Sequence, residues 1–204
     1  YAYNPTTFTL SIAEELNIGY QGRCIAWHKS GNYLVVSRGV TGTVRRVTIY
    51  QVLTSTFNAT PVDATTNANV SDAVNTGYQA LSWAEANDYL AVGFANTGGT
   101  TYELVIYKFT PNATFASSTL VLDSGLDISG RSINGLDWNP TGSYIAVGLN
   151  AGVDNLRIYQ HTQGSVVEKF KMSAGAEAIN SVRWSKDGTF LAIGKASAAN
   201  EDFE

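Results

Sequence analysis

The sequence is poor in the residue types on which most metal and catalytic sites depend. Its 204 residues include one cysteine, Cys24, and two histidines, His28 and His161. A single cysteine excludes an intramolecular disulfide framework, and we interpret Cys24 as a small buried hydrophobe. The chain has no cysteine pair, no His-x-x-x-His spacing and no glycine-rich phosphate loop. We therefore predict no cofactor, no metal and no catalytic residue, with His28 exposed in a turn and His161 at a strand end.

Charge is scarce as well. Only 15% of the residues are charged and the net charge is −4, so the chain lacks the positive field that attracts nucleic acid or an anionic membrane. The paired Arg45 and Arg46 lie in a strand-like run and are interpreted as an exposed strand edge. No apolar run approaches 18 residues, and Tyr1–Pro5 lacks the layout of a signal peptide. We expect neither nucleic-acid binding nor membrane insertion.

Four segments of the chain share one pattern centred on tryptophan. They span 24–36, 80–92, 135–147 and 181–193 and align without a gap. An aliphatic residue stands two positions before each tryptophan, a spacing that puts both side chains on one face of a strand. Glycine or asparagine stands four positions after it, as a tight hairpin requires. The tryptophans are Trp27, Trp83, Trp138 and Trp184.

A second, nearly unbroken apolar strand follows each hairpin and begins with an aromatic residue, which indicates burial on both faces. A third strand ends in a tyrosine in the first three copies, at Tyr50, Tyr107 and Tyr159. A further strand precedes the tryptophan segment, most clearly at Phe8–Leu16 and Val166–Met172. Four antiparallel strands in a repeat of 46 to 56 residues are typical of a β-propeller blade.

We therefore predict an all-β fold, a β-propeller of four-stranded antiparallel blades. The predicted blade boundaries are about 8–52, 60–109 and 115–161, with a partial fourth blade at about 165–204.

Two of the repeats resemble the second and third strands of a WD-repeat blade, namely Ile179–Gly194 and Ile133–Gly148. Propellers of the TolB type share a similar Trp-Ser-x-Asp-Gly turn and remain an alternative. The terminal Trp-Asp of WD repeats is replaced here by Tyr-Gln or Tyr-Lys, and the hairpin aspartate survives only as Asp187. We interpret Asp187 as a turn former.

The resemblance implies a closed ring, which three complete blades and one unfinished blade do not obviously form. Residues Tyr1–Thr7 are a candidate for the missing strand, although Pro5 restricts them to an edge. We expect either a larger propeller or a ring completed by another copy, because an open strand edge favours association.

Four carboxylates, at Asp123, Asp127, Asp137 and Asp187, are the candidates for convergence at a channel mouth. Nothing in their spacing requires this. Asp123 and Asp127 provide alternating oxygens but lack the remaining ligands of a calcium loop.

The segments Gln51–Asp72 and Thr110–Ser118 are interpreted as polar linkers between blades, rich in threonine, asparagine and alanine. This composition slightly favours an extracellular or cell-surface location over the cytoplasm. The linkers carry three N-glycosylation triplets, at Asn58, Asn69 and Asn112.

The main functional hypothesis is a non-catalytic scaffold that binds protein partners, or further copies of itself, through inter-blade loops and hairpin turns. The WD-repeat resemblance implies that these two loop sets share one rim. The candidate contact residues are Lys29, Asn32, Phe57, Glu85, Asn87, Asn112, Phe115, Asn139, Ser143, His161, Lys186 and Thr189, with Phe57 and Phe115 as exposed aromatic anchors. An extracellular or envelope structural protein that self-assembles by strand exchange is the alternative, and a propeller hydrolase or carbohydrate-active enzyme is the third hypothesis.

Overall fold

A computed structural model describes residues 2–11, 15, 21–39, 46–53, 56–57, 60–64, 78–95 and 102–196. These residues form an all-β structure with one 3-10 turn, η1 (Phe115–Ser117), so the predicted fold class is confirmed. None of the described helical segments is long and apolar enough to cross a membrane.

Three antiparallel sheets of four strands make up most of the structure. The first contains β3 (Gln21–Trp27), β4 (Tyr33–Gly39), β5 (Arg46–Gln51) and β6 (Val62–Asp63). The second contains β7 (Tyr78–Trp83), β8 (Tyr89–Phe94), β9 (Leu104–Thr110) and β10 (Thr119–Leu126). The third contains β11 (Ile133–Trp138), β12 (Tyr144–Leu149), β13 (Leu156–Thr162) and β14 (Ser165–Met172). In each, the strands pair in chain order.

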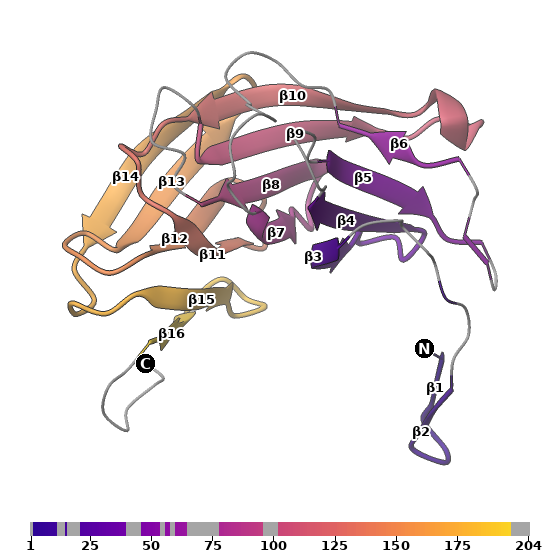
Figure 1. Ribbon diagram of the computed structural model, residues 1–204, viewed down its shortest axis with the longest axis horizontal. Helices are drawn as coiled ribbons and strands as arrows, with labels where there is room; N and C mark the ends of the chain where they lie inside the picture. Colours follow the sequence, from indigo (N-terminus) through magenta and orange to yellow (C-terminus); the bar gives the residue numbers. More distant parts are fainter. Residues whose placement is uncertain are drawn as a thin grey trace.

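Two smaller sheets complete the described structure. β15 (Ile179–Trp184) pairs with β16 (Leu191–Lys195), and β1 (Ala2–Asn4) pairs with β2 (Thr9–Ser11). The sheets fan along an arc with the tryptophan-bearing strands β3, β7, β11 and β15 on its concave side (Figure 1). The strands described here do not close a ring.

The sheet boundaries lie one strand later than the predicted blade boundaries. β14 was expected to open the fourth blade, but it pairs with β13 as the outer strand of the third sheet. The strand that precedes a tryptophan segment in the sequence therefore belongs to the previous sheet. Residues 2–4, the expected closing strand, pair instead with β2.

The core lies between the sheets. We call the face of each sheet that carries the tryptophan its leading face and the opposite one its trailing face. Leu81 and Trp83, on the leading face of the second sheet, pack against Val35 and Ile49 on the trailing face of the first. The same arrangement joins the second sheet to the third and the third to β15–β16. The leading faces of the second sheet, the third sheet and β15–β16 are thus each buried by the sheet before them.

The hairpins after the tryptophan strands follow the predicted turn chemistry in three of four copies. Gly31, Gly142 and Gly188 adopt φ values of 72°, 70° and 74°, which glycine reaches without strain. Asn87 does not adopt a positive φ, contrary to expectation. Its side-chain oxygen instead accepts a hydrogen bond from the Tyr89 amide, so the turn is held by an Asx-type contact.

A buried acid, Glu103, anchors the loop that follows the second sheet. Its Oε2 accepts the Ile128 amide at 2.8 Å, while its buried Oε1 has no hydrogen-bond partner. Asn155 occupies the same place before β13, where its Oδ1 accepts the Ala174 amide and its Nδ2 donates to two carbonyls. Burial, with a contribution from Asp127, raises the pKa of Glu103 above its usual value.

The raised pKa of Glu103 makes stability depend on pH. The folded state holds the proton more tightly than the unfolded state, so stability should fall as pH rises from about 4.3 through the raised pKa. Glu103→Gln should remove this dependence and increase the free energy of unfolding at neutral pH by about 1 kcal/mol. Urea unfolding across pH measures both effects. Glu85→Gln, at an exposed position, is the control, and an unchanged pH profile in Glu103→Gln would contradict the assignment.

Candidate functional site

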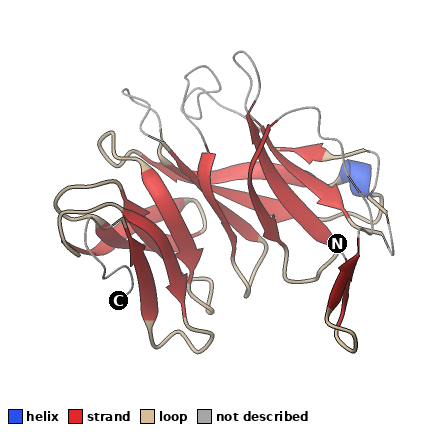
Figure 2. Cartoon of the chain, turned by 60° about the horizontal axis from the view of Figure 1, so that its bottom comes forward, coloured by secondary structure: helices blue, strands red, loops and turns tan. Residues whose placement is uncertain are grey.

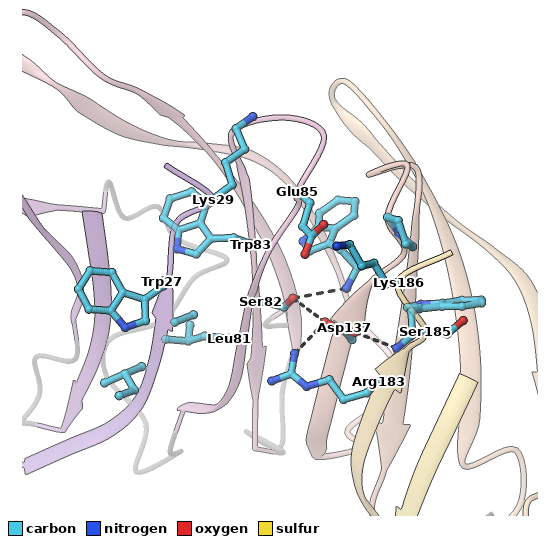
Figure 3. A pocket seen from close by; sticks show the side chains of 15 residues that line it. Trp27, Lys29, Leu81, Ser82, Trp83, Glu85, Asp137, Arg183, Ser185 and Lys186 are labelled. Atoms are coloured by element: carbon cyan, nitrogen blue, oxygen red, sulfur yellow. Dashed lines mark hydrogen bonds and ion pairs between the residues drawn. The ribbon is translucent and has the colours of Figure 1, made fainter. Parts of the chain in front are cut away.

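A groove of about 570 Å³ runs along the concave side of the arc, bordered by the four tryptophan-bearing strands and their hairpins. Its wall combines exposed aromatic surface at Trp27 with charged side chains at Glu85, Arg183 and Lys186. Figure 3 shows Asp137 near the centre of this groove, between Ser82 on one side and Arg183 on the other.

Asp137 joins three sheets through hydrogen bonds. Ser82 donates to its Oδ1 at 2.9 Å, and the Arg183 guanidinium donates to the same oxygen at 3.0 Å. The Trp184 amide donates to Oδ2 at 2.9 Å. The Asp137 side chain is only 12% exposed, and these three donors stabilise its buried charge.

This network uses one position of the repeat, the residue directly before the tryptophan. Ser82 Oγ accepts the Trp138 amide of the next sheet at 3.4 Å, as Asp137 accepts that of Trp184. In the first copy the position is Ala26, which has no polar side chain. A polar side chain at this position accepts a hydrogen bond from the backbone amide of the tryptophan in the next sheet. Without it, that amide would face the groove unpaired.

The hairpins between first and second strands and the connections between third and fourth strands lie at the same edge of the sheets, because consecutive strands are antiparallel and in chain order. We call this edge the hairpin rim. The connections between sheets lie at the opposite rim. The expectation that inter-blade loops share a rim with the hairpins is therefore wrong. Residues 110–118, interpreted as an inter-blade linker, connect β9 and β10 within the second sheet, and the segment 51–72 contains β6.

All twelve predicted contact residues nevertheless fall on the hairpin rim, because each lies in a hairpin or at a connection between third and fourth strands. Exposed members are Lys29, Asn32, Glu85, Asn112, Lys186 and Thr189; half-buried members are Phe57, Asn87, Asn139 and Ser143; Phe115 and His161 are buried. The two buried residues do not present a free surface.

His28 is buried, contrary to the expected solvated turn residue. Its ring packs edge-on against Trp83 of the next sheet, and 5% of the residue is exposed. The Ser30 amide donates to Nδ1, so Nε2 carries the proton and donates to Asp88 at 3.2 Å. Burial lowers the pKa of His28, which favours this neutral form. Asp88 also pairs with Lys29 at 3.3 Å.

His161 is likewise buried, between Tyr89 and Trp138. Its Nε2 lies 2.8 Å from Asp123 Oδ2, and the same oxygen accepts the Gly164 amide. Asp123 thus joins the second sheet to the third. A serine hydroxyl lies beside each His–Asp pair: Ser30 Oγ is 2.9 Å from His28 Nδ1, and Ser124 Oγ donates to Asp123 Oδ2 at 3.1 Å.

The other predicted carboxylates do not converge with Asp137. Asp127 accepts the Ser129 amide, and Asp187 accepts the Thr189 amide and the Ser185 hydroxyl, which confirms Asp187 as a turn former. Within the described ranges, no three His, Cys, Asp or Glu side chains group as metal ligands. Asp123 is instead committed to His161.

The predicted aromatic anchors differ in environment. Phe115 is 4% exposed and stacks on Tyr33 of the preceding sheet, so its expected role as an exposed anchor is wrong. Phe57 is half-buried against Tyr50.

Asn112 is exposed, whereas Asn58, Asn69, Arg45 and the Arg46 side chain lie outside the described part. Cys24 is half-buried rather than buried.

Sequence reasoning missed Asp88, Ser82 and Arg183. Ser82 and Arg183 occupy the position before tryptophan, where the polar residues Ser, Asp and Arg in successive copies were the available signal. No local sequence pattern indicates the role of Asp88, because its partners come from other segments of the chain.

The architecture defines this chain as a β-propeller. No protein-family model matches the sequence, and no curated protein matches it significantly. Solved WD40 propeller structures do match. The β-propeller domain of Cps50 (Swd1) from Myceliophteria thermophila has a TM-score of 0.59 at 18% identity, over 87% of this chain and 51% of that one.

Two further solved propeller structures are similar to this chain. A chain of the mitotic checkpoint complex gives a TM-score of 0.58 at 20% identity, over 85% of this chain and 47% of that one. Sqt1 from Chaetomium thermophilum gives 0.61 at 15% identity, over 85% and 40%. The chain spans about half the length of these structures or less, and the likeness establishes the fold.

The Asp137 network predicts a large stability effect. In Asp137→Asn an NH₂ group would face a donor in either orientation, because both carboxylate oxygens accept hydrogen bonds. We expect a loss of about 2–3 kcal/mol in the free energy of unfolding, measured by urea denaturation. Asp154→Asn is the matched control, since its exposed pair with Lys171 contributes less than about 0.5 kcal/mol. Equal losses in the two variants would refute the network.

Proposed function

We propose that this chain is a non-catalytic scaffold that binds protein segments on its hairpin rim. The observation that carries the proposal is the hydrogen bonding between neighbouring blades along that rim. His28 of the first sheet bonds to Asp88 of the second, and Asn87 of the second bonds to the Gly142 carbonyl of the third at 3.3 Å. A rim held in this way loses little conformational entropy when it binds a partner.

The individual hairpins are also held internally. Asn139 Oδ1 accepts the amides of Ser143 and Tyr144, and Ser185 Oγ accepts the amide of Phe190. Exposed side chains such as Glu85, Lys186 and Thr189 therefore project from fixed turns. Recognition residues are commonly found on loops that a rigid scaffold positions.

The mixed charge of the rim suits a polar or mixed-charge peptide rather than a polyanion. Lys29 is paired with Asp88, and Arg183 is paired with Asp137. Glu85 lies on the same groove wall as Lys186. The solved structures that resemble this chain include a member of a named protein complex, which is compatible with a role in protein assembly.

The proposal predicts that rim substitutions weaken peptide binding without changing the fold. Peptides selected from a random library on the unmodified protein should bind the double variant Glu85→Lys, Lys186→Glu at least about tenfold more weakly, a change of roughly 1.4 kcal/mol. Fluorescence anisotropy measures the affinities.

Lys169→Glu is the matched control, because Lys169 is exposed on the outer strand β14, away from the rim. It should bind the selected peptides as the unmodified protein does. Peptides that bind the double variant and the unmodified protein equally would exclude the hairpin rim as the binding surface.

A further inference from the structure

A hydroxyl, an imidazole and a carboxylate are in contact on the hairpin rim. Ser30 Oγ lies 2.9 Å from His28 Nδ1, and His28 Nε2 lies 3.2 Å from Asp88 Oδ1. Ser30 and His28 belong to the turn between β3 and β4, and Asp88 belongs to the corresponding turn between β7 and β8. Both turns are among the loops drawn in tan in Figure 2. In this order of groups, a base can activate a nucleophile while an acid orients the base.

The backbone of the first turn determines where the protons of this group point. The Ser30 amide donates to His28 Nδ1 at 3.3 Å, so Nδ1 is an acceptor and the Nε2 proton is directed at Asp88. The Asn32 amide donates to Ser30 Oγ at 3.2 Å, which leaves the hydroxyl hydrogen free to bond to Nδ1. The serine hydroxyl therefore donates to an unprotonated ring nitrogen, as removal of its proton requires.

The imidazole is enclosed, whereas the hydroxyl is open to a ligand. His28 is 5% exposed, and its ring packs edge-on against Tyr33 and Trp83. Ser30 is exposed. A Cβ built on the neighbouring Gly31 would meet no atom of the described chain within 4 Å. The base is thus held in position by packing, while the nucleophile lies on an accessible turn.

The charged groups around His28 keep its ring neutral at neutral pH. Burial lowers the pKa of His28, and Lys29 adds to this effect, while the hydrogen bond and the charge of Asp88 oppose it. Asp88 is also paired with Lys29 at 3.3 Å and with Lys108 at 3.9 Å. Tyr33 is the remaining ionisable side chain in ring contact with His28 among the described residues. A neutral imidazole is the form that can accept a proton.

The other hairpins show that the first turn differs in its chemistry rather than in its shape. The same two positions are in contact in the third hairpin, where Asn139 Nδ2 donates to Thr141 Oγ1 at 2.7 Å. They are also in contact in the fourth hairpin, where the Ser185 hydroxyl donates to Asp187. The second copy has alanine at both positions. Of the four copies, the first alone places a base beside a hydroxyl.

The second His–Asp pair has a different order of groups. Ser124 Oγ donates to Asp123 Oδ2 at 3.1 Å, and His161 Nε2 lies 2.8 Å from that same oxygen. The serine hydroxyl is thus bound to the acid rather than to the imidazole. This pair does not provide a base for its serine.

We propose that Ser30 is a reactive nucleophile that takes an acyl group from an activated carboxylic ester. Ser30 Oγ bonds to the carbonyl carbon of the ester, and His28 Nδ1 accepts the hydroxyl proton. The bond from the carbonyl carbon to the leaving oxygen then breaks, and the proton passes from His28 to that oxygen. The products are an acyl-serine and an alcohol or a phenol. Asp88 is a positioning residue, because it holds the ring and stabilises the imidazolium ion.

The reaction is tested with p-nitrophenyl acetate as the ester. It should release about one equivalent of p-nitrophenol per chain, because one serine is activated in this way. Mass spectrometry of the digested protein should place the acetyl group on Ser30. Ser30→Ala should abolish that release, and this exposed position should tolerate the change. Thr141→Ala is the matched control, because Thr141 occupies the same place in the third hairpin beside an amide. Acetylation of Lys29 instead of Ser30 would overturn the proposal.

The pH dependence of the acetylation rate tests the roles of the imidazole and the acid. The rate should fall as pH decreases through the pKa of His28, and it should be about 100-fold lower in His28→Ala. Asp88→Asn should lower the rate at least about tenfold and move the midpoint of the pH profile to lower pH, because it removes the charge that favours the imidazolium ion. A purely structural role for Asp88 would leave that midpoint unchanged.

Unchanged rates in Ser30→Ala or in a folded His28→Ala would overturn the proposal, as would an unchanged midpoint in Asp88→Asn. Ser30→Ala and Asp88→Asn provide the test even where His28→Ala does not fold. Peptide binding at the hairpin rim is measured separately and does not require the Ser30 hydroxyl. Either proposal can therefore fail alone.

Discussion

The structure depends on one repeated contact, the burial of a tryptophan-bearing strand against the sheet before it. Trp83 and Trp138 are almost fully buried by this contact, whereas Trp27, at the start of the arc, is 54% exposed. The sheets approach so closely that a Cβ added at Gly135 would lie 2.7 Å from the Cα of Ser181 on the next inner strand. A blade of this kind buries both its faces only by stacking, so the number and order of neighbours decide which residues are core.

The same stacking builds the polar contacts of the groove and the rim. Asp137 receives donors from the sheets on both sides, and His28 is enclosed because Trp83 belongs to the next sheet. These side chains connect sheets as well as filling space, which restricts the relative movement of the blades. A rigid rim and a curved groove therefore have one cause. The functional proposal rests on that rigidity.

The sequence predicted most of the fold because its signals are local. The pattern of aliphatic, tryptophan, turn residue and aromatic identified β3 with β4, β7 with β8, β11 with β12 and β15 with β16 within a few residues. It did not assign the outer strands to sheets, because β14 stands next to β15 in the chain but pairs with β13. Pairing between distant segments is not encoded in a local pattern, and the predicted blade boundaries were one strand early for that reason.

The sequence by itself determined the all-β repeat, the positive-φ glycines of three hairpins and the place of the predicted contact residues at hairpins and strand ends. Each of these follows from residues within one repeat. Only the tertiary structure decided that His28, His161 and Phe115 are buried and that Asp137 is shared between sheets. Each of these depends on a neighbouring sheet, whose position is set by packing between segments that lie 46 to 56 residues apart in the chain.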